Sequence, residues 1–395
     1  MLQKAVRQAA KASSFKEAAE DLHDLIGVSI SATHLQRLSE RIGGEWAQAQ
    51  NQDIQKFRDD KLARGYEKPP QVATVMLDGG RYQTRADDQG RGVTDPAWKE
   101  TKVACCQTLA SKEHASDPQP EPPRKFLEPE RVARLAAQMK ARTAPGRSEK
   151  PAPAGPRPRR RRSKKSRPQK LVRTVVATTA AIEPFGWQVS AEVHRRGLDR
   201  AGRKACICDG SHALWALFEL HLLAAGFIGI LDFVHLLVHL YATAGATQGK
   251  GSAGAWRLYE RWLRWAWSGE VKCLLSGLRQ AARQVGEPPP GVSEEDPRKI
   301  VADAVTYVEN NRGRMDYPRY RCLGLPISSA PVESAIKQLN RRVKGSEKFW
   351  LQGGAEALLQ VRAAYLSEDG RAERYWARAR PYARAAGPKR LRPAA

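Results

Sequence analysis

The sequence predicts an α/β protein that begins with a helical region. Two observations indicate this class. Apolar runs with the length and composition of strands alternate with amphipathic segments that have helical spacing, and residues 14–43 have a helical pattern before any strand occurs. At 395 residues the chain has room for more than one domain and for a large buried core.

The N-terminal segment 14–43 has the pattern of two short helices around Gly27, with Ser31 as the N-cap of the second. The apolar side chains expected to pack between them are Phe15, Ala18, Ala19, Leu22 and Ile26 on the first helix and Leu35, Leu38 and Ile42 on the second. The side chains expected at the surface of the second helix, suited to groove and phosphate contacts, are Thr33, His34, Gln36 and Arg37. A plain helical hairpin has a similar pattern, and the net charge favours DNA binding.

The charge of the chain is strongly positive. There are 67 Lys and Arg against 42 Asp and Glu, a net charge of +25 and an isoelectric point near 10.1. This balance indicates a polyanionic partner, most simply nucleic acid. An anionic membrane surface is the competing partner, but no apolar run is long enough to span a bilayer and the N-terminus lacks a signal peptide. We therefore expect a soluble, cytoplasmic protein. Its 6 cysteines contain no CxxC pair, which favours buried free thiols over zinc or disulfides.

The strands are predicted in two groups. The run 72–77 is followed by Asp78, Gly79 and Gly80 and by the alternating "RYQTR", which predicts a strand, a tight turn and a second strand. "KVACCQTLA", 102–110, would complete an antiparallel meander. Further on, "KACICDG", a helix "SHALWALFELHLLAAG" and "FIGILDFVH" form a β-α-β crossover.

Two other stretches differ from this core. Segment 111–170 is rich in Pro and Arg, and residues 157–170 contain nine Lys and Arg and no acid. We expect it to be disordered apart from a short helical piece, and able to hold phosphates non-specifically. Residues 236–325 read as a helical insertion whose tryptophans could stack on a flipped base but more simply form its core: Trp256, Trp262, Trp265 and Trp267.

Carboxylates at the ends of apolar strands are the candidate catalytic and metal-binding groups. Asp78 and Asp209 each end a strand and precede a glycine, and Asp232 ends a third strand. Glu333 lies in the first turn of a helix that Ser329 would cap. The residues expected on the buried face of this helix are Val332, Ala335, Ile336, Leu339 and Val343. A single such Asp is common in turns, and a glutamate in a first turn complements the helix dipole without any further role.

The order of these elements favours a shared catalytic site over separate turn and helix-cap roles. A β-meander, then β-α-β, then a helix with a lone Glu is the order in which an RNase H-like sheet presents three carboxylates. Oxygen ligands on two strands and a helix suit two Mg²⁺ ions, which would activate an attacking hydroxyl and stabilise the leaving oxygen.

The blocks "DGGRYQTR", "DGSHALWALF…GILDFVHLLVHL" and "GLPISSAPVESAIKQLNRRVKGSEKFW" resemble the DDE transposases of bacterial insertion sequences, in particular the ISKra-type branch, over residues 14–366. The resemblance implies an RNase H-like core with an all-α insertion after a helix-turn-helix. It implies Asp78, Asp209 and Glu333 as catalytic residues and ligands of two Mg²⁺ ions, with Mn²⁺ able to substitute. Asp232 is the alternative second acid, and His235 a neighbour of the ions.

The resemblance also implies partners. They are DNA, as element ends and target, and other copies of the chain on that DNA, in the bacterial nucleoid. The expected DNA contacts beyond the N-terminal helices are Arg160, Arg161, Lys337, Arg341, Arg342 and Lys344. For Arg341, Arg342 and Lys344, a solvated helix face is the alternative interpretation. His212, His221, His235 and His239 are expected to be packed or to support ligands rather than to bind zinc.

These expectations divide the chain as follows: 1–66, helix-turn-helix region; 71–110, first part of the core; 111–170, disordered basic insert; 171–240, second part of the core; 241–325, helical insertion; 326–366, the helix with Glu333 and the end of the core; 367–395, basic tail. A nuclease that cuts without joining, and a domesticated DNA-binding protein without activity, are the rival interpretations.

Overall fold

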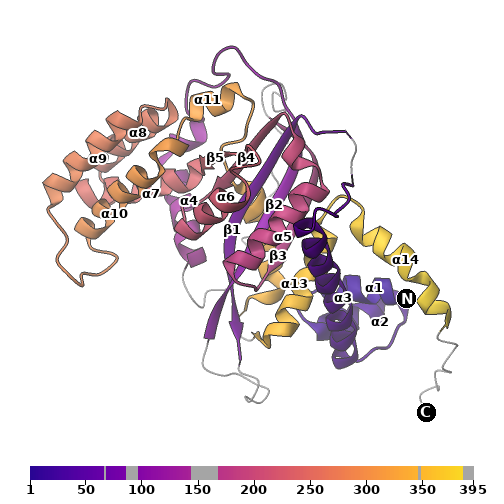
Figure 1. Ribbon diagram of the computed structural model, residues 1–395. Helices are drawn as coiled ribbons and strands as arrows, with labels where there is room; N and C mark the ends of the chain where they lie inside the picture. The colour runs from indigo at the N-terminus through magenta and orange to yellow at the C-terminus, as the bar shows by residue number, and fades with distance from the viewer. Residues whose placement is uncertain (66–67, 86–96, 144–167, 346–347, 386–395) are drawn as a thin grey trace.

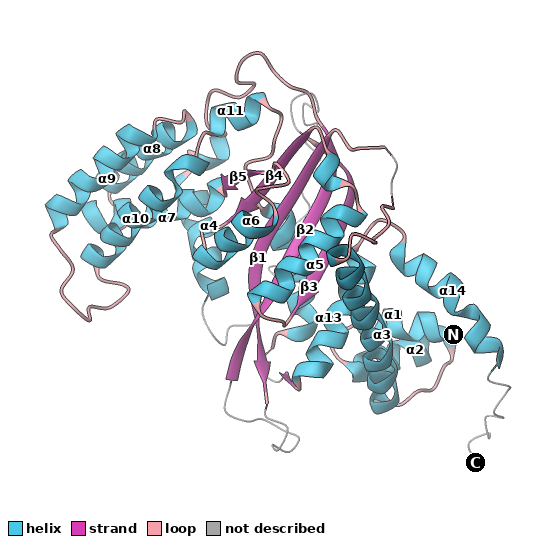
Figure 2. Ribbon diagram, viewed as in Figure 1, coloured by secondary structure: helices cyan, strands magenta, loops and turns pink. Residues whose placement is uncertain are grey.

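The structure is a computed structural model that describes residues 1–65, 68–85, 97–143, 168–345 and 348–385. A mixed sheet lies at its centre with helices packed around it (Figure 1, Figure 2). The strands are β1 (Val72–Thr84), β2 (Ala97–Ala110), β3 (Gln169–Thr178), β4 (Arg203–Cys208), β5 (Ile228–Leu231) and β6 (Phe349–Trp350). Their order is β3-β2-β1-β4-β5, with β6 beside β1. β1 is antiparallel to β2, which is antiparallel to β3, whereas β4 is parallel to β1 and β5 to β4.

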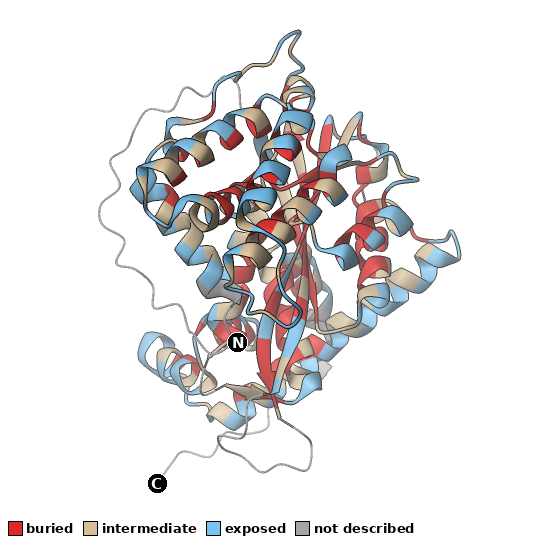
Figure 3. Ribbon diagram, turned by 90° about the vertical axis from the view of Figure 1, so that its left-hand side faces the viewer, coloured by how far each residue is buried: buried red, intermediate tan, exposed pale blue. Residues whose placement is uncertain are grey.

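The helices precede, separate and follow the strands along the chain. They are α1 (Leu2–Lys11), α2 (Phe15–Ile26), α3 (Ala32–Arg58), η1 (Arg124–Phe126), α4 (Pro129–Thr143), α5 (Ile182–Arg195), η2 (Leu198–Arg200), α6 (His212–His221), α7 (Phe233–Gln248), α8 (Ala253–Trp267), α9 (Val271–Val285), α10 (Pro297–Asn311), η3 (Arg312–Arg314), α11 (Tyr317–Cys322), α12 (Ala330–Val343), α13 (Gln352–Leu366) and α14 (Arg371–Ala385). Buried residues concentrate in the sheet and on the helix faces that pack against it (Figure 3).

The predicted turn after residue 77 is wrong, because β1 continues through it. Gly79 pairs with Lys102 and Gly80 with Thr101 on β2. The glycines serve close packing instead of a turn: a Cβ added at Gly80 would lie 2.6 Å from the Thr101 hydroxyl oxygen. The third antiparallel strand is therefore β3, which the sequence analysis did not anticipate.

The short helical piece predicted in the basic insert 111–170 is α4, and the segment before it, which was expected to be disordered, is also folded. Phe126 and Val132 are buried in the main core, and α4 packs against α7. Order in this segment comes from apolar side chains that a neighbouring helix covers. Arg160 and Arg161 lie outside the described residues.

The N-terminal helices have the predicted turn and caps. Gly27 ends α2 with a left-handed φ of 65°, and the Ser31 hydroxyl accepts from the amide of His34. Ala18, Leu22 and Leu35 form a small core. The second helix is longer than predicted because α3 runs on to Arg58 and packs against α5 and α13.

The helical insertion and the C-terminal segment complete the fold. α7 to α10 form an arm beside the sheet (Figure 1), in which Trp262 and Trp267 are buried as core residues. The predicted basic tail is a helix in part, since α14 covers residues 371–385 and Trp376 is buried. Within the described ranges, no helix is both long and apolar enough to span a bilayer.

Candidate metal centre

Three aspartates lie level with one another on neighbouring strands. Met76 of β1 pairs with Ile207 of β4, and Cys208 of β4 pairs with Leu231 of β5. Continuing this parallel register places Asp78 level with Asp209 and Asp209 level with Asp232. The Asp232 amide still donates to the Cys208 carbonyl at 2.8 Å, which supports the extension. The carboxyl ends of β4 and β5 therefore deliver acids to one place, as the carboxyl ends of parallel strands do.

Helix α12 brings Glu333 to the same place. The five residues predicted on its inner face are buried, and Glu333 is half-buried in the first turn. A Cβ at Gly80 would lie 3.6 Å from Cγ2 of Ile336, so α12 covers the face of β1 to which Gly80 points. Because side chains alternate along a strand, Asp78 points to that face too.

Asp232 is the most firmly held of these acids. It is fully buried and N-caps α7 rather than ending a strand as predicted, with Oδ1 accepting from the amides of Val234 at 2.5 Å and His235 at 3.1 Å. Its Oδ2 accepts from the Ser329 amide at 2.5 Å and from the Ser329 hydroxyl. Burial alone would raise the pKa of Asp232, but the interactions with His235 and Ser329 lower it. The carboxylate thus joins the start of α7 to the start of α12.

His235 lies one turn along α7 with its ring next to these acids. Its Nδ1 is 3.7 Å from Oδ2 of Asp232, an ion-pair distance rather than a hydrogen bond. Burial alone would lower the pKa of His235, but the carboxylate of Asp232, with smaller contributions from Asp209 and Asp78, raises it to about 9. The imidazole is therefore protonated at neutral pH. Because the charges of Asp78 and Asp209 contribute to this rise in pKa, both acids lie near the ring of His235.

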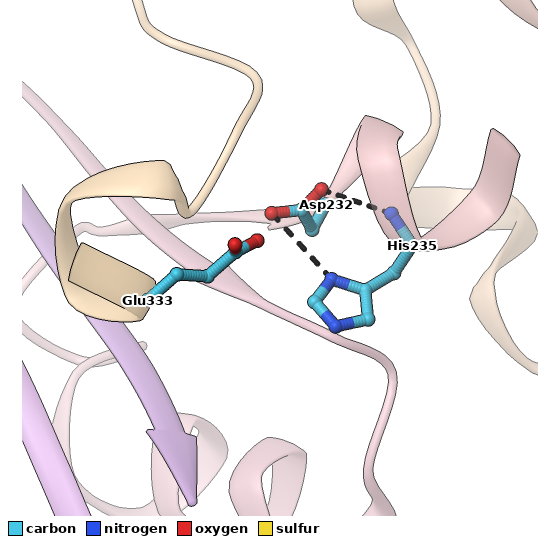
Figure 4. Close-up of side chains that lie close together, drawn as sticks. All are labelled: Asp232, His235 and Glu333. Carbon is cyan, nitrogen blue, oxygen red and sulfur yellow. Dashed lines mark hydrogen bonds and ion pairs between the residues drawn. The ribbon is translucent and has the colours of Figure 1, made fainter. Parts of the chain in front are cut away.

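Asp232, His235 and Glu333 lie close enough together to hold a metal ion. One ligand atom from each lies within 4.8 Å of the others. Figure 4 shows the Glu333 carboxylate reaching from α12 toward that of Asp232, with the imidazole of His235 turned toward the same carboxylate. Carboxylate oxygens suit a hard cation such as Mg²⁺, whereas a protonated imidazole has no lone pair to offer one.

Asp209 and Asp78 are half-buried beside this group. The Asp209 carboxylate accepts one hydrogen bond, from the Ser211 amide at 2.9 Å. The Asp78 carboxylate accepts from the Gly79 amide at 2.7 Å. Among the described contacts, the Asp209 carboxylate is less engaged than that of Asp232, both of whose oxygens accept hydrogen bonds.

The side chains predicted to contact DNA on α3 are placed as expected for the most part. Thr33, His34 and Arg37 are exposed, and Gln36 is half-buried with its amide donating to Glu40 at 2.8 Å. The basic side chains predicted to contact DNA on α12 differ in exposure. Lys337 and Arg341 are exposed and Lys344 is half-buried.

The expectation that Arg342 contacts DNA is wrong. Its side chain is buried, with Nε donating to the Ala9 carbonyl at 3.0 Å and the guanidinium lying 4.1 Å from the Phe15 ring centroid. Ala9 is in the last turn of α1, where carbonyls lack helical partners and the helix dipole attracts a cation. Arg342 therefore attaches the N-terminal helices to α12. Arg362 of α13 acts in parallel by donating to the Ala10 carbonyl.

The remaining candidates are structural. His221 packs on Gly186, with Nδ1 3.0 Å from the Ser190 hydroxyl, and burial lowers its pKa. His212 is exposed at the start of α6. The thiols of Cys105, Cys106, Cys206 and Cys208 are free and buried, as expected, whereas Cys273 is free but exposed and Cys322 free and half-buried.

The sequence analysis missed two residues at the site. Ser329 was expected only as a helix cap, yet its hydroxyl donates to Asp232 instead. Tyr307 of α10 donates its hydroxyl to the Asp209 carbonyl. Neither had a signal in the sequence, because each contact joins segments about a hundred residues apart.

We find no protein-family model that matches the chain, and no curated protein that is significantly similar to it.

Proposed function

We propose that this protein is a DNA transposase that binds insertion-sequence ends and carries out Mg²⁺-dependent cleavage and strand transfer. One observation carries the proposal: β1, β4 and β5 bring Asp78, Asp209 and Asp232 level, and α12 places Glu333 over the same face. The strand order and directions agree with the RNase H-like core that the resemblance implies.

Within this proposal, Asp78, Asp209 and Glu333 hold the metal ions. Two Mg²⁺ ions would supply charge to activate the attacking hydroxyl and to stabilise the leaving oxygen. Asp232 is the weaker candidate for the second ligand, because four donors already occupy its oxygens. It and the protonated His235 instead set the position of α12 and partly neutralise the acids before the ions bind.

DNA binding is proposed for two exposed basic surfaces. Thr33, His34 and Arg37 begin α3 at the surface, as side chains that read a groove do in a helix-turn-helix. Lys337 and Arg341 extend from the outer side of the helix that carries Glu333. Cations beside a metal site can hold the phosphates of the strand to be cut.

A strand-transfer assay tests the function. Labelled duplexes made from the DNA on either side of the reading frame would be incubated with the protein, target DNA and Mg²⁺. We expect cleaved ends and joined products from the parent and neither from Glu333→Gln or Asp209→Asn, with end binding kept. Glu309→Gln, a helical glutamate paired with Arg279 on the insertion, is the matched control and should be active.

Each other outcome selects a rival. Cleavage without joining would assign a nuclease, and end binding without chemistry would assign a domesticated DNA-binding protein. Full activity of Glu333→Gln would reject the acidic triad. Loss of activity in Asp232→Asn but not in Asp209→Asn would move the second ligand to Asp232.

A further inference from the structure

Asp209 is the first residue after β4 and begins a turn. β4 ends at Cys208, and the residue after Asp209 is Gly210 with a φ of 103°, a left-handed conformation that favours glycine. The carboxylate makes its one hydrogen bond to the Ser211 amide within the same turn. The conformation of this turn decides the direction in which the Asp209 carboxylate points.

Tyr307 of the helical insertion covers this turn. Its hydroxyl donates to the Asp209 carbonyl at 2.6 Å, and its Cε2 would lie 2.4 Å from a Cβ added at Gly210. The ring also stacks on that of His239, with centroids 4.2 Å apart and planes 24° apart. The tyrosine is thus held by α7 on one side and packs against the glycine of the turn with its ring edge.

The same part of the insertion holds the segments after β4 and β5. Trp215 of α6 donates its indole N–H to Asn311 at 2.7 Å, and the Tyr317 hydroxyl donates to the Leu231 carbonyl at 3.1 Å. Leu231 precedes Asp232. The end of α10 and the start of α11 therefore contact the backbone beside both acids on the parallel strands.

We infer that Tyr307 is a positioning residue for Asp209, through which the helical insertion sets the affinity of the site for divalent metal. The inference rests on the proposed function, in which Asp209 is a ligand. Mg²⁺ demands a narrow range of ligand directions, and loss of a group that orients a ligand typically weakens metal binding about 10- to 100-fold. Without the phenol hydroxyl the peptide between Asp209 and Gly210 loses a hydrogen bond to the insertion and keeps only the packing of the ring.

The test compares two Tyr→Phe variants. Tyr307→Phe removes the hydroxyl at Asp209 and keeps the ring. Tyr259→Phe is the matched control, since Tyr259 is also a buried tyrosine of the insertion whose hydroxyl donates to a backbone carbonyl, that of Phe126 at 3.0 Å, away from the acids. Mn²⁺ binding is measured by titration calorimetry without DNA. Hydrogen–deuterium exchange of residues 208–214 is measured in EDTA.

We expect Tyr307→Phe to bind Mn²⁺ about 10-fold more weakly and to exchange faster at residues 208–214, with its unfolding midpoint in urea close to that of Tyr259→Phe. The Tyr259→Phe protein should match the parent in both metal affinity and exchange. Parental Mn²⁺ affinity in Tyr307→Phe, or an equal loss in both variants, would overturn the inference and leave the proposed function intact. A parent that binds no Mn²⁺ and cuts no DNA would reject the proposed function itself, and the inference with it.

Discussion

Replacing Asp232 by Asn should destabilise the fold far more than the same change at Asp209. Asp232 is fully buried, and each of its oxygens accepts from two donors: the amides of Val234 and His235 on one side, and the amide and hydroxyl of Ser329 on the other. An Asn must turn its NH₂ group toward one of these pairs, so at least one backbone amide would face a donor. The ion pair with His235 is lost as well.

The expected loss can be worked from these contacts. Hydrogen bonds to a charged group contribute about 1.5–3 kcal/mol each, and breaking a buried ion pair costs about 3–5 kcal/mol in comparable cases. These terms overlap, because one carboxylate makes all the contacts, so we expect the free energy of unfolding of Asp232→Asn to fall by about 3–5 kcal/mol. At Asp209 the Asn oxygen can still accept from the Ser211 amide, and the change should stay within about 0.5 kcal/mol.

Equilibrium unfolding in urea at pH 7 with EDTA, followed by tryptophan fluorescence, measures both values on the metal-free protein. The two variants serve as controls for each other, since each removes one carboxylate charge from the same cluster. A destabilisation of Asp232→Asn below about 1 kcal/mol, or an equal loss in Asp209→Asn, would refute the assignment of Asp232 to holding α7 against α12.

Three further predictions concern the same surroundings. The pKa of His235 in the folded protein is raised to about 9, so the protonated imidazole stabilises the fold fully below the unfolded pKa of about 6.5, and this stabilisation is lost as pH rises through 9. Over that pH range the free energy of unfolding of the parent should fall by on the order of 3 kcal/mol more than that of His235→Gln, measured in urea with EDTA. Arg342→Ala should lower the free energy of unfolding by about 3 kcal/mol, because a charged hydrogen bond and ring contacts are lost. Arg341 is an exposed neighbour, and Arg341→Ala should change this free energy by less than about 0.5 kcal/mol. Equal values for the two variants would contradict the role given to Arg342. Without Mg²⁺, Glu333→Gln should have the same melting temperature as the parent or a higher one, because repulsion among the acids falls. Mg²⁺ should raise the melting temperature of the variant less than that of the parent. An equal rise in both proteins would count against ligation by Glu333.

Much of the local structure could be predicted because near neighbours in the chain decide it. The inner face of α12, the cap at Ser31 and the left-handed Gly27 follow from helical spacing and from the preferences of single residues. The strands that end directly before Asp209 and Asp232 were also predicted, since a short apolar run followed by Asp has few other interpretations.

The errors share a cause, which is that a distant segment decided the outcome. Asp-Gly-Gly is a turn sequence in isolation, but β2 pairs with β1 on both sides of it, so the chain runs straight. Arg342 borders the apolar face of α12 and reads as exposed until α1 packs over it. The Pro-rich segment before α4 is ordered because Phe126 packs into the main core, against Phe233 of α7.

The sequence by itself determined which acids could take part in a site, because Asp78, Asp209, Asp232 and Glu333 all carry signals in their immediate neighbours. Only the tertiary structure decided how they differ. The register of three parallel strands brings the aspartates level, Ser329 and two helix amides occupy the oxygens of Asp232, and Tyr307 holds the backbone of Asp209. Apart from the two helix amides, which belong to the local N-cap of α7, those contacts join positions tens of residues apart or more, and their energies depend on burial and on distances that exist only in the folded chain.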